Sequence, residues 1–476
     1  MTATLDGLSP TVRQVVARAA DPSSYERWAE QVAATGYCAR PVRLAGRVDA
    51  VDRDTGEVRQ AYCTDAEPDA TLLKACGNRR QSVCPSCAAT YRSDAWQLIA
   101  AGLRGGKGVP ETVAGHPAVF ATFTAPSFGP VHSRRARNGR TLTCRPKDPR
   151  TCPHGRPKGC RRRHDPDDPT LGQPLCAECY DPDGAVLWNA VAPELWRRTT
   201  IYMRRALARL CGVSRAQLER TVRVSYVKVA EYQRRGLVHF HAVVRLDAAP
   251  PKGEPQRVDP PPAAFTVGLL EDAVRLAAAT VSAPIPATGD GRTRVARWGQ
   301  QLDIRHIHDA GVDALTPEVV AAYIAKYATK STEPLGLVPT DLPDDPDTVD
   351  APDHIRELIA ACARLGRLPQ LAHLGLVEHA GLLGFRGHWS TKSRRYSTTL
   401  GALLAARRDY AVRRRHGQPL DPWGRPVTEE TVVVLPRWRF TGIGHRTPGD
   451  AWLAQSAAAS AREQRQAARL ELAVAA

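Results

Sequence analysis

The stretch on which the fold depends is Val229-Ala230-Glu231-Tyr232-Gln233-Arg234-Arg235-Gly236-Leu237-Val238-His239-Phe240-His241-Ala242-Val243-Val244. Two β-type runs flank the loop 234–236, and its glycine suits the positive φ that a three-residue hairpin loop requires. Centring the hairpin on this loop places Glu231 opposite His239. We therefore predict two paired strands, over residues 222–232 and 237–246.

The two histidines of this stretch point to a metal site. His239 and His241 are two residues apart, so both imidazoles leave the same face of a strand, and Phe240 faces the other, buried side. Two imidazoles and the Glu231 carboxylate then converge on one point. This set suits Mn²⁺ or Mg²⁺ with positions open for a substrate oxygen. The alternative is a polar surface strand, which the registered glutamate disfavours.

Further elements extend outward from this hairpin. Apolar patterns predict strands at 118–124 and 302–308, and helices near 195–210, 270–282 and 317–330. Strands interleaved with helices in this way favour an α+β domain built around one antiparallel sheet.

The helix predicted at 317–330 carries two candidate nucleophiles. Thr316 suits an N-cap and Pro317 a first helical position. Tyr323 and Tyr327 are four residues apart and share one face of the helix, with Lys326 on a neighbouring stripe. A phenol with a pKa near ~10 is a weak nucleophile, so nearby cations would have to assist it. The alternative is an amphipathic helix with buried aromatic rings.

One competing metal motif is present. Arg305-His306-Ile307-His308 also has a hydrophobe between two histidines. It lacks a carboxylate in hairpin register, and it ends only fifteen residues before Tyr323. We therefore favour His239 and His241.

The 12 cysteines indicate structural zinc, because their spacing includes two Cys-x-x-Cys pairs and no secretory leader is visible. We expect a first zinc site at Cys63, Cys76, Cys84 and Cys87. In an Arg- and Pro-rich insertion, Cys144, His154 and His164 offer more ligands than one ion can use. There we favour a second site at Cys152, Cys160, Cys176 and Cys179.

The charge balance indicates a nucleic-acid partner. The 476 residues include 66 Lys and Arg against 49 Asp and Glu, a net charge of +17. No run is long and apolar enough for a membrane span, and we expect a cytoplasmic protein. Cations mixed with Trp389 and Tyr396 suit phosphate contacts and base stacking. The candidate DNA-binding residues are Arg234, Arg235, Arg386, His388, Lys392, Arg394 and Arg395.

These motifs resemble those of a known family. His239-Phe240-His241 followed by Tyr323 and Tyr327 resembles the HUH endonucleases, in particular the two-tyrosine rolling-circle initiators. Phe120-Ala121-Thr122-Phe123-Thr124-Ala125-Pro126 looks like that family's first motif. Cys76-Gly77-Asn78-Arg79-Arg80, Cys84-Pro85-Ser86-Cys87 and the run 384–397 extend the resemblance to RepSA-type initiators of actinobacterial plasmids and integrative conjugative elements.

The resemblance implies a function and a role for each residue. It implies a ferredoxin-like HUH core that nicks one DNA strand at an origin, leaving a 5′-phosphotyrosine and a 3′-OH primer. Tyr323 would be the first nucleophile, Tyr327 the second, and Lys326 would assist at the phosphate. Host helicase and replication machinery would be partners, because no Gly-x-x-x-x-Gly-Lys-Ser/Thr loop of a fused helicase is present.

The expected organisation follows from these motifs. The predicted regions are an N-terminal helical region (1–60), a four-cysteine zinc module (61–110), the endonuclease core (115–332) with a zinc-binding insertion (140–182), an acidic Pro-rich linker (333–353) and a basic helical DNA-binding region (354–476). Two other functions are compatible with some of the motifs. A zinc-containing DNA-binding regulator without catalysis is the main alternative, and an Fe(II) oxygenase site explains neither the tyrosines nor the charge.

Overall fold

The computed structural model describes residues 8–145, 150–307, 315–329, 335, 348–416, 420–425 and 431–474. The chain divides into two compact units, one made of residues 1–94 with 399–476 and the other of residues 95–398. This division differs from the predicted regions, because the C-terminal segment belongs to the same unit as the N-terminus. Of the predicted linker, residues 333, 334 and 336–347 lie outside the described residues.

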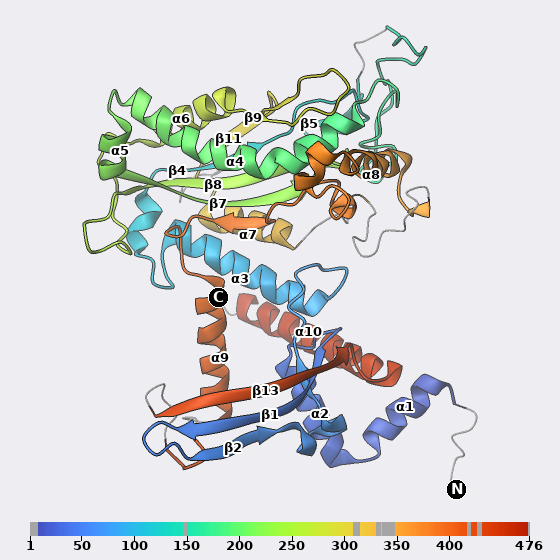
Figure 1. Ribbon diagram of the computed structural model, residues 1–476, viewed down its shortest axis with the longest axis vertical. Coiled ribbons are helices and arrows are strands. Elements are labelled where there is room, and N and C mark those ends of the chain that lie inside the picture. Colours follow the sequence, from blue (N-terminus) through green and yellow to red (C-terminus); the bar gives the residue numbers. More distant parts are fainter. Residues whose placement is uncertain are drawn as a thin grey trace. The chain divides into compact units, whose positions relative to one another are not determined.

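The larger unit is built on a five-stranded antiparallel sheet (Figure 1). The strand order is β11-β4-β8-β7-β12. The strands are β4 (Ala118–Phe123), β7 (Val222–Tyr232), β8 (Val238–Ala248), β11 (Leu302–His306) and β12 (Ser390–Lys392). Four of them match predicted strands, and the antiparallel α/β architecture is as expected. The short β12 completes the sheet by pairing with β7.

Helices cover both faces of this sheet (Figure 1). On one face, α4 (Pro182–Leu210) and α6 (Val267–Thr280) bury the core, where Phe240 is fully buried and packs edge-on against Trp196 of α4. On the other face lies α7 (Pro317–Ala328), beside β7. The helix α4 starts thirteen residues before the predicted position because Asp181 caps it and Pro182 occupies its first turn.

The segment after the predicted linker is part of this unit. Helix α8 (Asp353–Gly366) buries Ile355, Leu358 and Ile359 in the same core cluster as Phe240. The expectation of one basic helical region over 354–476 is therefore corrected: its first 45 residues, up to Thr398, complete the core unit. The apolar face of α8 is what holds it there. The remaining short elements of this unit are α5 (Arg215–Thr221), β5 (Arg135–Arg137), β6 (Arg140–Leu142), β9 (Ala283–Pro284) and β10 (Val295–Ala296).

The smaller unit contains a second antiparallel sheet, with β1 paired to β13 on one side and to β2 and β3 on the other. Its strands are β1 (Val42–Asp52), β2 (Val58–Cys63), β3 (Leu72–Lys74) and β13 (Val432–Ile443). Its helices are α1 (Pro10–Ala19), α2 (Pro22–Ala34), α9 (Leu400–His416) and α10 (Pro448–Val474). The boundary between the units falls within α3 (Pro85–Arg104). None of the described helices has the length and hydropathy of a membrane span.

Candidate active site

The β7–β8 hairpin positions the candidate metal ligands. Glu231 pairs with His239 across the two strands, which is the predicted register. Gly236 adopts φ 78° and its N–H donates to the Gln233 carbonyl at 2.9 Å, closing the turn. The hairpin loop therefore forms as its sequence predicts, and its register brings the carboxylate to the histidine face.

The three ligand atoms form a compact set. Glu231 Oε2 lies 3.0 Å from His239 Nε2 and 3.1 Å from His241 Nε2. Ligands held at ~2.1 Å and at right angles around a divalent cation lie about 3 Å apart. The Nδ1 of His241 lies 3.1 Å from the Thr122 hydroxyl, which leaves Nε2 directed at the set. The donor set and its spacing thus fit an octahedral cation with open positions.

The electrostatics of the set favour cation binding. Burial raises the pKa of the Glu231 carboxyl, but hydrogen bonds with His239 and His241 outweigh burial and bring that pKa below its ordinary value. Burial lowers the pKa of His241, so its imidazole is neutral at pH 7. A charged carboxylate and a neutral imidazole are the forms that bind a metal ion.

Helix α7 brings both tyrosines to His241. The helix starts at Pro317, with the Thr316 hydroxyl accepting from Val319 N–H. The ring centroid of Tyr323 lies 5.1 Å from that of His241, and the Tyr327 centroid lies 5.6 Å from it. Tyr323 is 39% exposed, so part of its side chain is open to solvent. Lys326 Nζ lies 5.7 Å from the centroid of the Tyr327 ring.

The environment of Tyr323 keeps its phenol protonated. Burial raises the pKa of Tyr323, and the neighbouring Tyr327 raises it further. Phe120 of β4 lies beneath, stacked on His241 and edge-on to Tyr323. The stretch 120–126, which resembles the first HUH motif, therefore contributes the aromatic ring of Phe120 to the site.

The competing histidine motif is not part of this set. His306 ends β11, and its Nε2 lies 2.7 Å from Glu271 Oε2 on α6. His308 lies outside the described residues. Within the described chain, the cluster of ligand atoms on this sheet consists of Glu231, His239 and His241.

Comparison with known proteins places the chain in a family. A model of the RepSA family, described as the replication initiator protein of pSAM2, matches residues 24–459. The chain belongs to this family. It is also 45% identical over 469 residues to a replication initiator protein of Streptomyces ambofaciens, which covers 97% of this chain and 96% of that protein. No solved structure matches the chain.

A basic cavity of about 1140 Å³ lies beside the hairpin loop of this RepSA member. Arg235 lines it and donates to the Ala125 and Pro126 carbonyls, each at 2.9 Å, so part of its role is to hold the loop. Arg234 is exposed. The arginines that line the cavity are Arg134, Arg145, Arg234, Arg235 and Arg297.

The segment 386–396 exposes fewer of the expected DNA-binding side chains than its sequence predicts. Tyr396 is fully buried and its hydroxyl donates to the Ile99 carbonyl at 3.1 Å, so it does not offer a face for base stacking. Lys392 Nζ donates to the Ser397 carbonyl at 2.9 Å. The side chains left at the surface are those of Arg386, His388 and Arg394, with Arg395 half-buried.

The first cysteine cluster has a different fourth member from the predicted one. The sulfurs of Cys76, Cys84 and Cys87 gather with that of Cys38. The Cys38–Cys84 and Cys76–Cys87 sulfur pairs are each 3.7 Å apart, near the ~3.8 Å edge of a tetrahedron of thiolates around zinc. Cys63 ends β2 and lies outside this cluster. The pairing of Cys63 with Arg47 fixes its position in the strand. The spacing of cysteines along the sequence does not reveal this pairing.

The predicted second set is also corrected. Cys152, Cys176 and Cys179 come together with His154, whereas Cys160 lies in a separate cluster with Cys144, His132 and His164. Because structural zinc takes four ligands, the eight cysteines and histidines of this insertion could have indicated two sites from the sequence alone.

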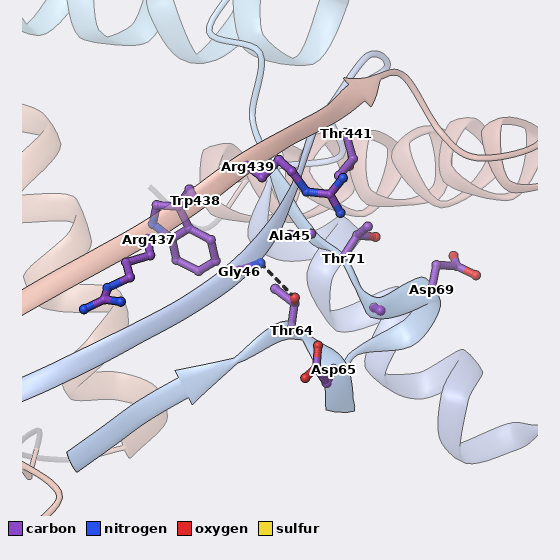
Figure 2. Close-up of a pocket in the computed structure, with 11 residues that line it drawn as sticks. Ala45, Gly46, Thr64, Asp65, Asp69, Thr71, Arg437, Trp438, Arg439 and Thr441 are labelled. Carbon is purple, nitrogen blue, oxygen red and sulfur yellow. Dashed lines mark hydrogen bonds between the residues drawn. The ribbon is translucent and has the colours of Figure 1, made fainter.

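A further surface was not identified from the sequence. The strand β13 exposes Arg437, Trp438, Arg439 and Phe440, and a cavity of about 680 Å³ lies against it. Figure 2 shows Trp438 above β1, with Gly46 N–H donating to the Thr64 hydroxyl at 3.0 Å. In the sequence, the alternation of arginines with aromatic residues could have indicated this surface, because that pattern suits contacts with single-stranded nucleic acid.

Proposed function

We propose that this initiator nicks one DNA strand at a replication origin and remains attached to its 5′ end. The observation that carries the proposal is the convergence of Tyr323 with Glu231, His239 and His241 on one face of the sheet. Membership of a replication initiator family supports a role in DNA replication. The proposed substrate is the origin of a plasmid or of an integrative element.

The proposed reaction is a transesterification by Tyr323. A bond forms between its Oη and the scissile phosphorus, and the bond from phosphorus to the 3′ oxygen breaks. The phenolic proton ends on the departing oxygen, giving a 5′-phosphotyrosine and a 3′-OH that primes synthesis. Phe120 and His241 pack against the Tyr323 ring and hold it in place. Orienting the nucleophile for attack therefore costs little further entropy.

Glu231, His239 and His241 would hold Mn²⁺ or Mg²⁺. Such a cation would stabilise the negative charge that develops on the phosphate oxygens. This matters because burial raises the pKa of Tyr323 and leaves the phenol protonated at neutral pH. Lys326 adds positive charge on the same helix.

Tyr327 is proposed as the second nucleophile. Its ring centroid is 4.7 Å from that of Tyr323 and 5.6 Å from that of His241, so both tyrosine rings lie beside the same proposed ligand. After a round of strand displacement by a host helicase, Tyr327 would attack the regenerated junction. The arginine-lined cavity beside the hairpin is the proposed path of the bound strand, and Zn²⁺ would hold the Cys38 cluster together.

The test is incubation of a supercoiled plasmid carrying the element's own origin with the protein and Mn²⁺. We expect relaxed circles with protein on the 5′ end, and no product with a chelator or with Tyr323→Phe. Tyr327→Phe is the matched control, and we expect this variant to make the first nick normally. Origin footprinting without nicking would indicate a DNA-binding regulator, and nicking by Tyr323→Phe but not by Tyr327→Phe would exchange the two roles.

A further inference from the structure

The insertion between β4 and α4 has almost no apolar core. Among its described residues between 127 and 180, the buried apolar side chains are Tyr180 and four of its five cysteines, Cys144, Cys152, Cys160 and Cys176. Yet its described residues include the hairpin β5–β6 and several isolated bridges. Something other than hydrophobic burial must supply its folding free energy.

Every cysteine and histidine of this insertion lies in one of two four-residue clusters. The first consists of His132, Cys144, Cys160 and His164, and the second of Cys152, His154, Cys176 and Cys179. In each, the four possible ligand atoms lie within 4.8 Å of one another. Four ligands of nitrogen and sulfur are the number and kind that structural zinc takes.

The first cluster has the dimensions of a tetrahedral site. Cys160 Sγ lies 3.5 Å from His164 Nε2, and His132 Nδ1 lies 3.3 Å from the same nitrogen. At ordinary zinc distances, a sulfur–nitrogen edge is about 3.6 Å and a nitrogen–nitrogen edge about 3.3 Å. Three of the four residues are buried and His132 is half-buried.

Neighbouring groups orient these ligands. Asp168 Oδ2 lies 2.7 Å from His164 Nδ1, which leaves Nε2 of that ring facing the cluster. The same carboxylate is held by the N–H and hydroxyl of Thr170, at 2.9 and 2.6 Å from Oδ1. The Ser133 N–H lies 3.2 Å from Cys144 Sγ, a contact that favours the thiolate. A carboxylate behind a histidine ligand is a recurrent feature of zinc sites.

The second cluster is centred on His154. Its Nδ1 lies 3.4 Å from Cys179 Sγ, 3.7 Å from Cys176 Sγ and 4.0 Å from Cys152 Sγ. These separations bracket the same ~3.6 Å sulfur–nitrogen edge.

We propose that the insertion binds two zinc ions through interleaved ligand sets, one of two cysteines with two histidines and one of three cysteines with a single histidine. Along the chain, two ligands of the first site precede two of the second, and then the order repeats. Each ion therefore bridges the two halves of the insertion, and neither half can complete a site alone. This cross-bracing gives a segment without an apolar core a single fold.

The first site also fixes one wall of the arginine-lined cavity. His132, Ser133, Arg134 and Arg145 all line that cavity. The insertion packs closely on the β7–β8 loop, because a Cβ at Gly172 would collide with the backbone carbonyl of Arg234. Loss of the first zinc would therefore disturb the cavity beside the hairpin.

The test is the zinc content of the full-length protein, measured by mass spectrometry of purified chains. Cys144→Ser should lower the content by at least one ion per chain. Cys211→Ser is the matched control, because Cys211 lies outside all of the clusters, and it should leave the content unchanged. A single site at Cys152, Cys160, Cys176 and Cys179 predicts no loss with Cys144→Ser, and that result would overturn the proposal.

A second measurement needs no variant that risks misfolding. ¹¹³Cd NMR of the cadmium-exchanged protein should show two resonances from the insertion, shifted according to two and three thiolate ligands. The Cys38 cluster, with four thiolates, would give a third at the extreme of the range. One insertion resonance in the four-thiolate range would contradict the two-site arrangement. Neither measurement depends on nicking, so the zinc proposal can fail while the proposed function stands.

Discussion

The ring of Tyr323 lies edge-on against the imidazole of His241, with centroids 5.1 Å apart and planes at 87°. Phe120 contacts both rings, so the three aromatic groups form one packed corner. The contact joins α7 to β8, two elements separated along the chain by α6, β9, β10 and β11 and by residues outside the described structure. A nucleophile candidate and a metal-ligand candidate are therefore held together by packing, before any substrate is present.

The carboxylate of the proposed metal site provides the first prediction. Glu231→Gln keeps the shape of the side chain but removes its charge, so Mn²⁺ affinity should fall about tenfold or more. Calorimetric titration of Mn²⁺ measures this. His306→Asn is the control, since His306 pairs with Glu271 and should not alter the affinity. If His306→Asn weakened Mn²⁺ binding and Glu231→Gln did not, the metal site would instead lie at the motif that contains His306.

A buried lysine predicts a pH dependence of stability. Lys228 is 3% exposed, its Nζ donates to the His388 carbonyl, and burial lowers its pKa to about 7. The unfolded chain, with the ordinary lysine pKa near ~10.4, binds this proton more tightly. Between about pH 7 and 10, the free energy of unfolding should therefore rise with pH, by up to about 1.4 kcal/mol per unit.

Thermal unfolding between pH 7 and 9 tests this contribution. The melting temperature of the wild type should rise relative to that of Lys228→Met as the pH increases. Lys252→Met, at an exposed position, is the control and should run parallel to the wild type. Parallel curves for Lys228→Met as well would mean that the lysine is not held neutral in the folded core.

The core of the larger unit could be predicted because its signals are local. Two β-type runs indicated β7 and β8, and a glycine at the turn indicated the register that pairs Glu231 with His239. Long-range pairing left no such signal. Strand β13 is held by β1, nearly 400 residues away in sequence, and its mostly exposed side chains hide the usual alternation.

The ligand sets show the same limit. Cys38 joins Cys76, Cys84 and Cys87 because β3 pairs with the start of β1, and this pairing brings Cys76 back beside Cys38. Spacing favoured Cys63, which is nearer in sequence but directed elsewhere by β2. Interleaved sites are harder still to predict from sequence, because successive pairs of ligands along the chain belong to alternate clusters.

The exposed face of β13 predicts a DNA contact in the smaller unit. Replacing Arg437 and Arg439 together with alanine should weaken binding of origin DNA and lower the slope of log affinity against log salt by up to about two. Fluorescence anisotropy over a salt series measures both. Arg462→Ala with Arg465→Ala removes the same charge from exposed positions on α10 and should leave both nearly unchanged. Equal losses in the two double variants would indicate only a general effect of net charge.

The covalent intermediate tests the central claim most directly. Protein trapped on a single-stranded origin oligonucleotide in Mn²⁺ is digested with protease and nuclease, and the nucleotide-bearing peptide is sequenced by mass spectrometry. The account predicts a 5′-phosphate ester on Tyr323 of α7, absent when a chelator is added. An adduct on a residue away from the His239 and His241 face, or cleavage with no adduct on any residue, would contradict it.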